Sequence, residues 1–223
     1  MGKSKKSSLN SKITDPYSTY AEELSKRYLS VPSILEDWGT LSFPQTDDFP
    51  ILDIGAGSGR ELAWLIRHGY TASGIEASPA MIQQALIAYP HIKEHLFQGR
   101  FPDLLIDFSW PAHLPGEGGW AGIVCCALIQ HIPDNQLFDF FFGALRLLRA
   151  NGRLLISYPT EHEENTRTYT DEFERVYYLR HPQQYESIFL QLGFMNINSA
   201  NSADNMGRAH TSWNTEIWQA PHY

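Results

Sequence analysis

Alternating glycines flanked by two acidic residues are the first feature of this 223-residue chain that could do chemistry. Gly55, Gly57 and Gly59 follow Asp53, and Glu76 lies 23 residues after Asp53. Because glycine has no Cβ, it lets the backbone turn sharply and lie close to a ligand. An acidic residue at about this distance accepts hydrogen bonds from the hydroxyls of a nucleoside ribose. The spacing therefore indicates a ligand that contains a nucleoside.

A strand, a turn and a helix must position these residues. Ile51, Leu52 and Ile54 form a short apolar run, which is typical of a parallel strand buried on both faces. A helix is expected over 60–68, and the free N–H groups at its start favour an anionic group near the turn. A second strand is expected over 71–75, and it ends at Glu76. This arrangement brings Glu76 to the same edge of the sheet as the turn.

The spacing of the glycines separates the possible ligands. A dinucleotide-binding turn requires G-x-G-x-x-G, whereas this chain has G-x-G-x-G with Arg60 in the place of the last glycine. The Lys followed by Ser or Thr of a phosphate-binding P-loop is also missing. A glycine turn without any ligand is the remaining structural alternative.

The run Leu-Asp-Ile-Gly-Ala-Gly-Ser-Gly at 52–59 resembles the first motif of class I S-adenosylmethionine (SAM)-dependent methyltransferases. Segments 74–81, 120–133 and 148–157 resemble later motifs of the same family, and the likeness is strong over about 48–160. The alternation of strands and helices predicts an α/β doubly wound sheet. The resemblance implies seven mostly parallel strands in the order 3-2-1-4-5-7-6, with a helical lid at the N-terminus.

The resemblance further implies that SAM is the cofactor and that one set of residues holds it. We expect cofactor contacts from Asp53, Gly55, Ala56, Gly57, Arg60, Glu76, Ala77, Met81, Arg100, Phe101 and Cys126. Related enzymes place Asp after the glycine at position 99 to accept from the adenine amino group, but Arg100 is a donor only. Adenine recognition then falls to the backbone of Arg100 and Phe101, with Phe101 stacking, or to Asp103.

Two segments are predicted to close over the cofactor. Aromatic and aliphatic residues recur at helical steps from Tyr17 to Leu29, so we expect an amphipathic helix within a lid at 13–45. By resemblance, Tyr20 and Arg27 on this helix are candidates for contact with the methionine part of SAM, although core packing and a solvated charge are the simpler interpretations. The acidic stretch 158–181 occupies the position of a substrate cap in related enzymes.

His131 is the candidate catalytic base. It follows the fourth expected strand, where the resembled family places residues that face the transferred methyl group. An unperturbed histidine has a pKa near 6.5, which suits a base at neutral pH. A histidine that holds the turn through a backbone hydrogen bond is an equally good interpretation.

Composition and charge limit the partners. The net charge is −8, which argues against a nucleic-acid substrate held through its phosphates. Residues 1–12 carry four lysines and little apolar surface, so we expect a disordered basic tail before a single domain at 13–223. Cys125 and Cys126 are neighbours on a strand and cannot form a disulfide framework, no metal site is expected, and no apolar run is long enough to cross a membrane.

The sequence therefore predicts a cytoplasmic, monomeric or homodimeric methyltransferase that transfers the methyl group of SAM to a small molecule. Two alternatives belong to other classes. One is a SAM-binding regulator without turnover. The other is an NAD-dependent oxidoreductase, which would share Gly55, Gly57 and Glu76 but should carry a glycine at position 60.

Overall fold

The computed structural model describes residues 15–44, 49–103, 105, 114–160, 168–204 and 211–222. The predicted tail at 1–12 lies outside the described residues, as do residues 161–167 of the predicted cap.

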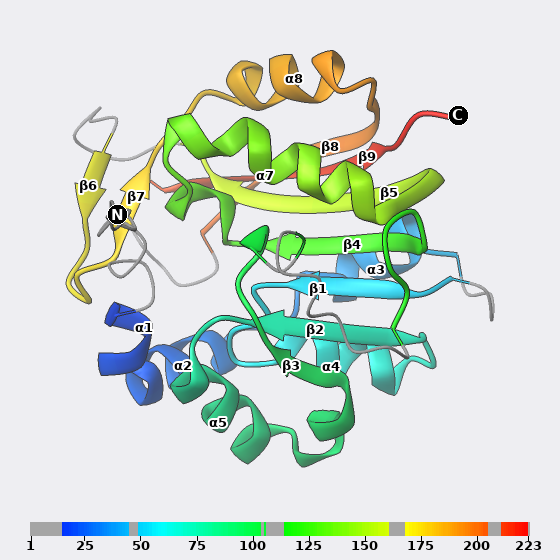
Figure 1. Cartoon of the computed structure of the whole chain (residues 1–223). Coiled ribbons are helices and arrows are strands. Elements are labelled where there is room, and N and C mark those ends of the chain that lie inside the picture. The colour runs from blue at the N-terminus through cyan, green and yellow to red at the C-terminus, as the bar shows by residue number, and fades with distance from the viewer. Residues whose placement is uncertain are drawn as a thin grey trace, which may run out of the picture.

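A seven-stranded sheet forms the centre of the protein, in the order β3-β2-β1-β4-β5-β9-β8 (Figure 1). The strands are β1 (Ile51–Ile54), β2 (Ala72–Glu76), β3 (Leu96–Gln98), β4 (Trp120–Cys126), β5 (Leu148–Pro159), β8 (Met195–Ala203) and β9 (Ser212–Gln219). The first five run parallel, and β9 is antiparallel to both of its neighbours. A separate hairpin of β6 (Thr168–Thr170) and β7 (Val176–Tyr178) precedes the last two strands. Apart from this shift in numbering, the predicted order is confirmed.

Helices cover both faces of the sheet, because neighbouring residues of its central strands point to opposite sides. Leu154 and Ile156 pack in the core beneath α7 (Asp134–Leu147) and α8 (Pro182–Gln191). Leu155 packs in the core on the other face. That face is covered by α3 (Leu35–Ser42), α4 (Arg60–Arg67) and α5 (Pro79–Ala88), followed by the short 3-10 helix η1 (Pro90–His95). Continuous apolar runs therefore produce a sheet buried on both sides.

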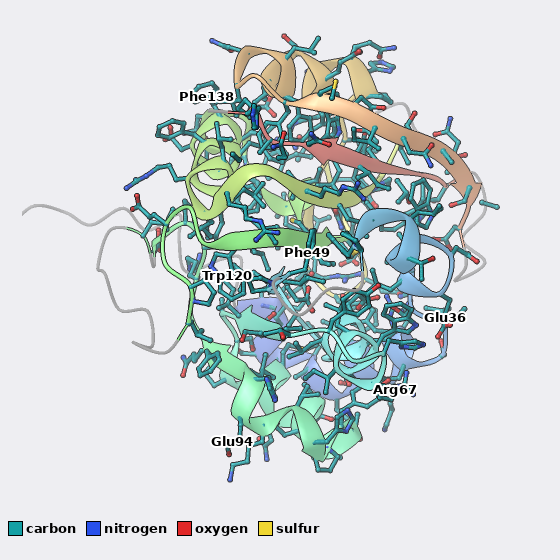
Figure 2. All side chains as sticks on the ribbon, turned by 90° about the vertical axis from the view of Figure 1, so that its right-hand side faces the viewer. Glu36, Phe49, Arg67, Glu94, Trp120 and Phe138 are labelled. Atoms are coloured by element: carbon teal, nitrogen blue, oxygen red, sulfur yellow. The ribbon has the colours of Figure 1, made fainter. Side chains whose placement is uncertain are left out.

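The side chains fill the space between the sheet and the helices (Figure 2). Phe49 and Trp120 are buried there, whereas Glu36, Arg67 and Glu94 point into solvent. Within the described ranges, no helix has both the length and the apolar character needed to cross a membrane.

The N-terminal helix differs from the prediction because it is broken. It forms α1 (Asp15–Thr19) and α2 (Ala21–Leu29), and both helices contact α5. The break lies at Tyr20, whose ring packs edge-on against Phe173, with 5.6 Å between ring centroids. The N–H of Tyr20 donates to the carbonyl oxygen of Pro16 and the N–H of Leu24 to that of Tyr20, both at 2.9 Å, so the interruption is local.

A tertiary contact holds the start of α7. Pro133 occupies the N-cap position, and no side chain caps the helix there. The Asp134 carboxylate instead accepts from Nε of the buried Arg180, at 2.7 Å. This charge-assisted hydrogen bond ties the start of α7 to the segment that follows β7.

Candidate functional site

The glycine turn between β1 and α4 leaves open space at one of its glycines. Gly57 has φ +53°, and a Cβ built there would lie 3.8 Å from its nearest neighbour, the carbonyl oxygen of Gly55. At Gly59, in contrast, a Cβ would lie 2.6 Å from the side chain of Ile92. Gly59 is therefore needed for packing, whereas the space above Gly57 faces a cavity that a ligand can enter.

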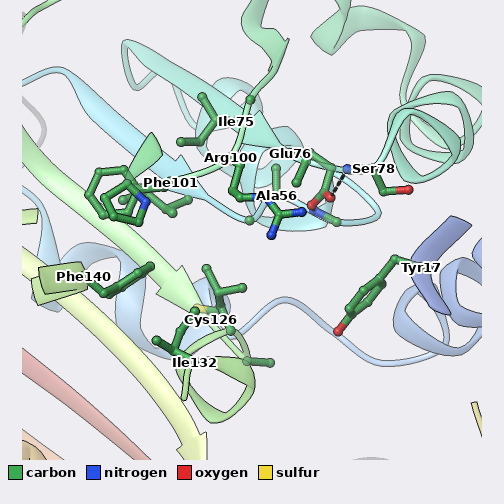
Figure 3. Close-up of a pocket in the computed structure, with 18 of the residues that line it drawn as sticks. Tyr17, Ala56, Ile75, Glu76, Ser78, Arg100, Phe101, Cys126, Ile132 and Phe140 are labelled. Carbon is green, nitrogen blue, oxygen red and sulfur yellow. Dashed lines mark hydrogen bonds between the residues drawn. The ribbon is translucent and has the colours of Figure 1, made fainter. Parts of the chain in front are cut away.

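Glu76, at the end of β2, is bonded to this same turn. Its Oε2 accepts from the backbone N–H of Gly57 at 2.9 Å, and its Oε1 accepts from that of Ser78 at 2.8 Å (Figure 3). Burial raises the pKa of the Glu76 carboxyl above its ordinary value, although these backbone donors oppose the shift. Each carboxylate oxygen retains capacity for a further donor.

A cavity of about 550 Å³ lies at the carboxyl ends of the parallel strands. Figure 3 shows it extending from Phe101 and Phe140 past Cys126 toward Tyr17, with Glu76 on one wall. The predicted cofactor residues that line it are Gly55, Ala56, Gly57, Arg60, Glu76, Ala77, Arg100, Phe101 and Cys126. The sheet brings these residues together because each lies at, or shortly after, the carboxyl end of a parallel strand.

Five predicted site residues do not line the cavity. Asp53 is buried in β1, where burial raises its pKa well above the ordinary value and its Oδ2 has no hydrogen-bond partner among the described residues. Met81 packs with Ala21 and Leu24 beneath the N-terminal helices. The others are Tyr20, Arg27 and His131.

Tyr20 and Arg27 contact the segment before β7 rather than the cavity. Tyr20 packs on Phe173, and Arg27 forms an ion pair with Glu172 at 2.5 Å. Their contact with a cofactor stays a prediction. Tyr17 and Tyr28 of the same two helices do line the cavity.

Arg60 ties the glycine turn to the N-terminal helices. Its guanidinium is paired with Glu61 at 2.7 Å and donates from Nη1 to the carbonyl oxygen of Tyr28 at 2.8 Å. Most of its donors are therefore used inside the protein, and its position at the cavity wall depends on α2.

The residues expected near adenine also line the cavity. Arg100 is 3.9 Å from Asp103, and the ring of Phe101 packs edge-on against Phe140 at 5.1 Å between centroids. Phe101 is buried and belongs to the core beneath α7. Arg100, Phe101 and Asp103 all line the cavity, so both predicted modes of adenine recognition stay open.

His131, in the 3-10 turn η2 (Ile129–His131), has partners at both ring nitrogens. Its Nδ1 lies 2.7 Å from the carbonyl oxygen of Val176, and its Nε2 lies 3.1 Å from the Tyr17 hydroxyl. Because a carbonyl can only accept, Nδ1 carries the proton, and Tyr17 donates to the lone pair of Nε2. Burial lowers the pKa of His131 to about 4. This geometry favours the interpretation of His131 as an anchor, and its role as a base stays a prediction.

The depressed pKa of His131 gives a testable stability profile. The unfolded chain binds a proton below about pH 6.5, whereas the folded chain does so only near pH 4. Stability should therefore be fully present above pH 6.5 and be lost as the pH falls toward 4, by up to roughly 3 kcal/mol. His131→Asn keeps a donor for Val176 but does not titrate. The difference in unfolding free energy between parent and variant should therefore shrink as the pH falls from 6.5 toward 4. Denaturant unfolding at several pH values measures it, and parallel pH profiles would contradict a histidine held neutral.

Sequence reasoning missed a buried arginine in the cap. Arg175 lies before β7, lines the cavity, is 5% exposed and donates from Nε to Oδ2 of Asp171 at 2.9 Å. It also donates from Nη1 to the Tyr28 hydroxyl and lies 5.4 Å from the ring centroid of Tyr177. The sequence analysis placed this stretch in the expected cap at 158–181 without singling out Arg175. The one local signal was the spacing of Asp171 and Arg175, four residues apart.

These contacts join three segments that are distant in the sequence. Tyr17 and Tyr28 come from the N-terminal helices, His131 from the turn after β4, and Arg175 and Val176 from the hairpin. Figure 1 shows the helices and the hairpin at the end of the sheet where the parallel strands terminate.

Comparison with known proteins identifies the type of domain. The model of a family described as a methyltransferase domain matches residues 20–199. An uncharacterized methyltransferase of Emericella nidulans is 25% identical over 150 residues, which cover 61% of this chain. The chain spans about half the length of that relative.

Two solved structures share the fold at low sequence identity. The [4+2]-cyclase SpnF superposes with a TM-score of 0.70 at 11% identity, covering 95% of this chain and 96% of its own. The 1,6-didemethyltoxoflavin-N1-methyltransferase of Burkholderia thailandensis, solved with its substrate and S-adenosylhomocysteine, gives 0.64 at 18% identity, covering 95% of this chain and 85% of its own.

Proposed function

Since the chain belongs to the methyltransferase-domain family, we propose that it transfers the methyl group of SAM to a small-molecule acceptor. SAM is the cofactor of this family, and when bound it supplies a methyl group on a sulfonium that is already activated for displacement. The protein's own contribution is then to bind, align and shield the two reactants.

The fit of the site to this cofactor carries the proposal. The carboxylate of Glu76 is bonded to the N–H of Gly57, the one glycine of the turn above which a side chain would enter open space. A nucleoside needs an acceptor for its ribose hydroxyls and a backbone that it can approach closely, and the two are adjacent here. The volume of the adjoining cavity lies within the usual range of ligand sites.

Residues at the two ends of the cavity would hold different parts of the cofactor. Glu76 would accept from the ribose hydroxyls, and the backbone at 55–57 would lie against the methionine part. Arg100 and Phe101 would flank the adenine. Arg60 would keep the turn and the N-terminal helices together, through its bonds to Glu61 and to the carbonyl oxygen of Tyr28.

The segments that cover the cavity favour a small molecule as the methyl acceptor. The helices α1 and α2 and the hairpin are held to each other by the pairs Arg27–Glu172 and Arg175–Tyr28, and Tyr17 is held to His131. We take these segments as a lid that excludes water from the reacting groups. The net charge of −8 disfavours a nucleic acid, and a cytoplasmic monomer or homodimer accords with the same picture.

His131 would act through Tyr17. By accepting from the tyrosine hydroxyl, the neutral imidazole fixes the ring of Tyr17 at the cavity wall. A base is required only when the acceptor must lose a proton, so this positioning role is compatible with methyl transfer without one.

A SAM-binding protein without methyl transfer is the second candidate. The cyclase SpnF has the same fold, which supports keeping a different activity open because a fold does not fix a reaction. Binding of NAD is disfavoured by Arg60, which stands where the third glycine of a dinucleotide turn belongs.

Calorimetry and a methyl-transfer assay test these proposals together. SAM should bind to the parent protein and NAD should not, and label from methyl-tritiated SAM should appear in a small-molecule acceptor. Binding of SAM without transfer to any acceptor in a broad panel would favour the second candidate.

Truncation at the N-terminus tests the lid. A chain lacking residues 1–29 should lose SAM, whereas one lacking residues 1–12 should keep it. Normal SAM affinity in the chain that lacks residues 1–29 would rule out the lid.

A further inference from the structure

Glu61 brings a carboxylate to the wall of the cavity at the start of α4. The residue is 7% exposed and lines the cavity. Its Oε1 accepts from Nε of Arg60 at 2.8 Å and lies 2.7 Å from Nη2 of the same guanidinium. The hydroxyl of Ser33 lies 3.4 Å from this same oxygen. Within the described ranges, the donors around Glu61 therefore converge on one of its two carboxylate oxygens.

The other carboxylate oxygen, Oε2, receives no hydrogen bond from any residue that the structure describes. The described side-chain oxygens that are both enclosed and without a partner belong to Ser42, Asp53 and Gln130. Because Oε2 of Glu61 is not one of them, it keeps accessible surface, and the cavity that Glu61 lines provides the access. A carboxylate oxygen in this position is suited to a donor that a ligand brings.

Carboxyl groups predominate around Glu61. Burial raises the pKa of Asp53 well above its ordinary value, and the negative charges of Glu61 and Glu76 add to this shift. Burial also raises the pKa of the Cys126 thiol, and the charge of Glu61 adds to that shift as well. Because such interactions weaken with distance, Glu61 lies near the carboxyl ends of both β1 and β4. This region of the wall therefore disfavours an anionic group of a ligand.

The guanidinium of Arg60 does not reverse this preference, because its donors are used inside the protein. Nε and Nη2 face Glu61, and Nη1 donates to the carbonyl oxygen of Tyr28 at 2.8 Å and approaches that of Val31 at 3.4 Å. An anionic ligand group would therefore meet Oε2 of Glu61 without a compensating donor. An ammonium group would satisfy this oxygen, since it carries three N–H donors and a positive charge.

We propose that Oε2 of Glu61 binds the α-ammonium group in the methionine part of SAM. This inference rests on the proposed function, in which the methionine part lies against the backbone at 55–57, and Glu61 follows this turn as the second residue of α4. It makes Glu61 a cofactor-binding residue that distinguishes SAM from adenosine derivatives without an ammonium group.

Three ligands separate the ammonium contact from the other contacts of the cofactor. S-adenosylhomocysteine carries both the ammonium and the carboxylate, its desamino analogue has hydrogen in place of the ammonium group, and methylthioadenosine lacks both groups. Calorimetry on the full chain measures their affinities. We expect the parent to bind S-adenosylhomocysteine about tenfold to a hundredfold more tightly than the desamino analogue, because a charge-assisted hydrogen bond is lost.

The variant Glu61→Gln keeps a carbonyl oxygen for Arg60 and puts an amide NH₂ group in the place of Oε2. The ratio of the affinities for S-adenosylhomocysteine and its desamino analogue should fall about tenfold, whereas the affinity for methylthioadenosine should stay that of the parent. Arg60→Met is the matched control, since it removes the partner of Oε1 and leaves the carboxylate of Glu61 in place. It should retain the parent's ratio even where it weakens all three ligands.

Several outcomes would overturn the proposal. They are equal affinities of S-adenosylhomocysteine and the desamino analogue for the parent, an unchanged ratio in Glu61→Gln, and the same fall of the ratio in Arg60→Met. If Glu61→Gln does not fold, Glu61→Asp repeats the test, because it withdraws the carboxylate by one methylene group; an unchanged ratio in that variant has the same consequence. The proposed function fails separately, when SAM itself does not bind or no methyl group is transferred.

Discussion

Gly57→Val should reduce the affinity for SAM by more than a hundredfold while the protein still folds. The added Cβ would lie 3.8 Å from its nearest protein neighbour, so the fold has room for it. The branched side chain would then occupy the space in which the cofactor should lie against the backbone. The positive φ of +53° costs roughly 1–2 kcal/mol for any residue with a Cβ. Calorimetry with SAM, on protein whose folding is checked by circular dichroism, measures the effect.

A glycine far from the cavity supplies the matched control. Gly69 ends the turn after α4 with φ +80°, and nothing lies within 4 Å of a Cβ built there. Gly69→Val should therefore cost a similar amount of stability and leave the affinity for SAM unchanged. Ser58→Ala should also bind like the parent. If Gly57→Val binds SAM as tightly as Gly69→Val does, the turn has only a structural role.

The strands of the sheet and their order could be predicted from the sequence because the patterns that mark them are local and recur along the chain. Apolar runs such as 51–54 mark strands buried on both faces, and the glycine turn and Glu76 mark where two strands end. Parallel order then follows from the alternation of strands and helices together with the family resemblance. The residues that follow these strand ends line the cavity for the same reason, since strand order alone brings them together.

The segments that cover the cavity were harder to predict because their residues meet across long distances in the sequence. The resemblance assigned Tyr20 to the site, but Tyr17 and Tyr28 of the same predicted helical stretch line the cavity, whereas Tyr20 packs on Phe173. Arg175 stood within a charged run that resembles a solvated surface, and only the fold shows that Asp171 neutralises it. His131 was placed by its position after β4, but its partner Val176 lies 45 residues away. Neither the hydrophobic pattern nor the secondary-structure propensity of a segment predicts contacts between residues so far apart in the sequence.

Glu76→Gln should weaken SAM binding by roughly tenfold to a hundredfold, because it removes a charged acceptor of ribose hydroxyls from a buried position. This substitution is preferable to Glu76→Ala. The glutamine keeps a carbonyl oxygen for one of the N–H groups of Gly57 and Ser78, whereas alanine would leave both donors without the partner that they have in the parent. Glu76→Ala should therefore lose stability as well as affinity, and the comparison of the two variants separates these effects.

The pH dependence of binding distinguishes a ligand-binding carboxylate from a structural one. Burial raises the pKa of Glu76 above its ordinary value, so this carboxyl contributes stability that is present below the ordinary pKa and is lost as the pH rises through the raised one. SAM binding has the opposite sign, because the ribose hydroxyls donate best to the ionised carboxylate. The affinity of the parent should therefore fall as the pH drops through the raised pKa of Glu76, and this fall should be absent from Glu76→Gln. Calorimetric titrations across that range measure both curves; equal affinities of parent and variant at every pH would remove Glu76 from the cofactor site.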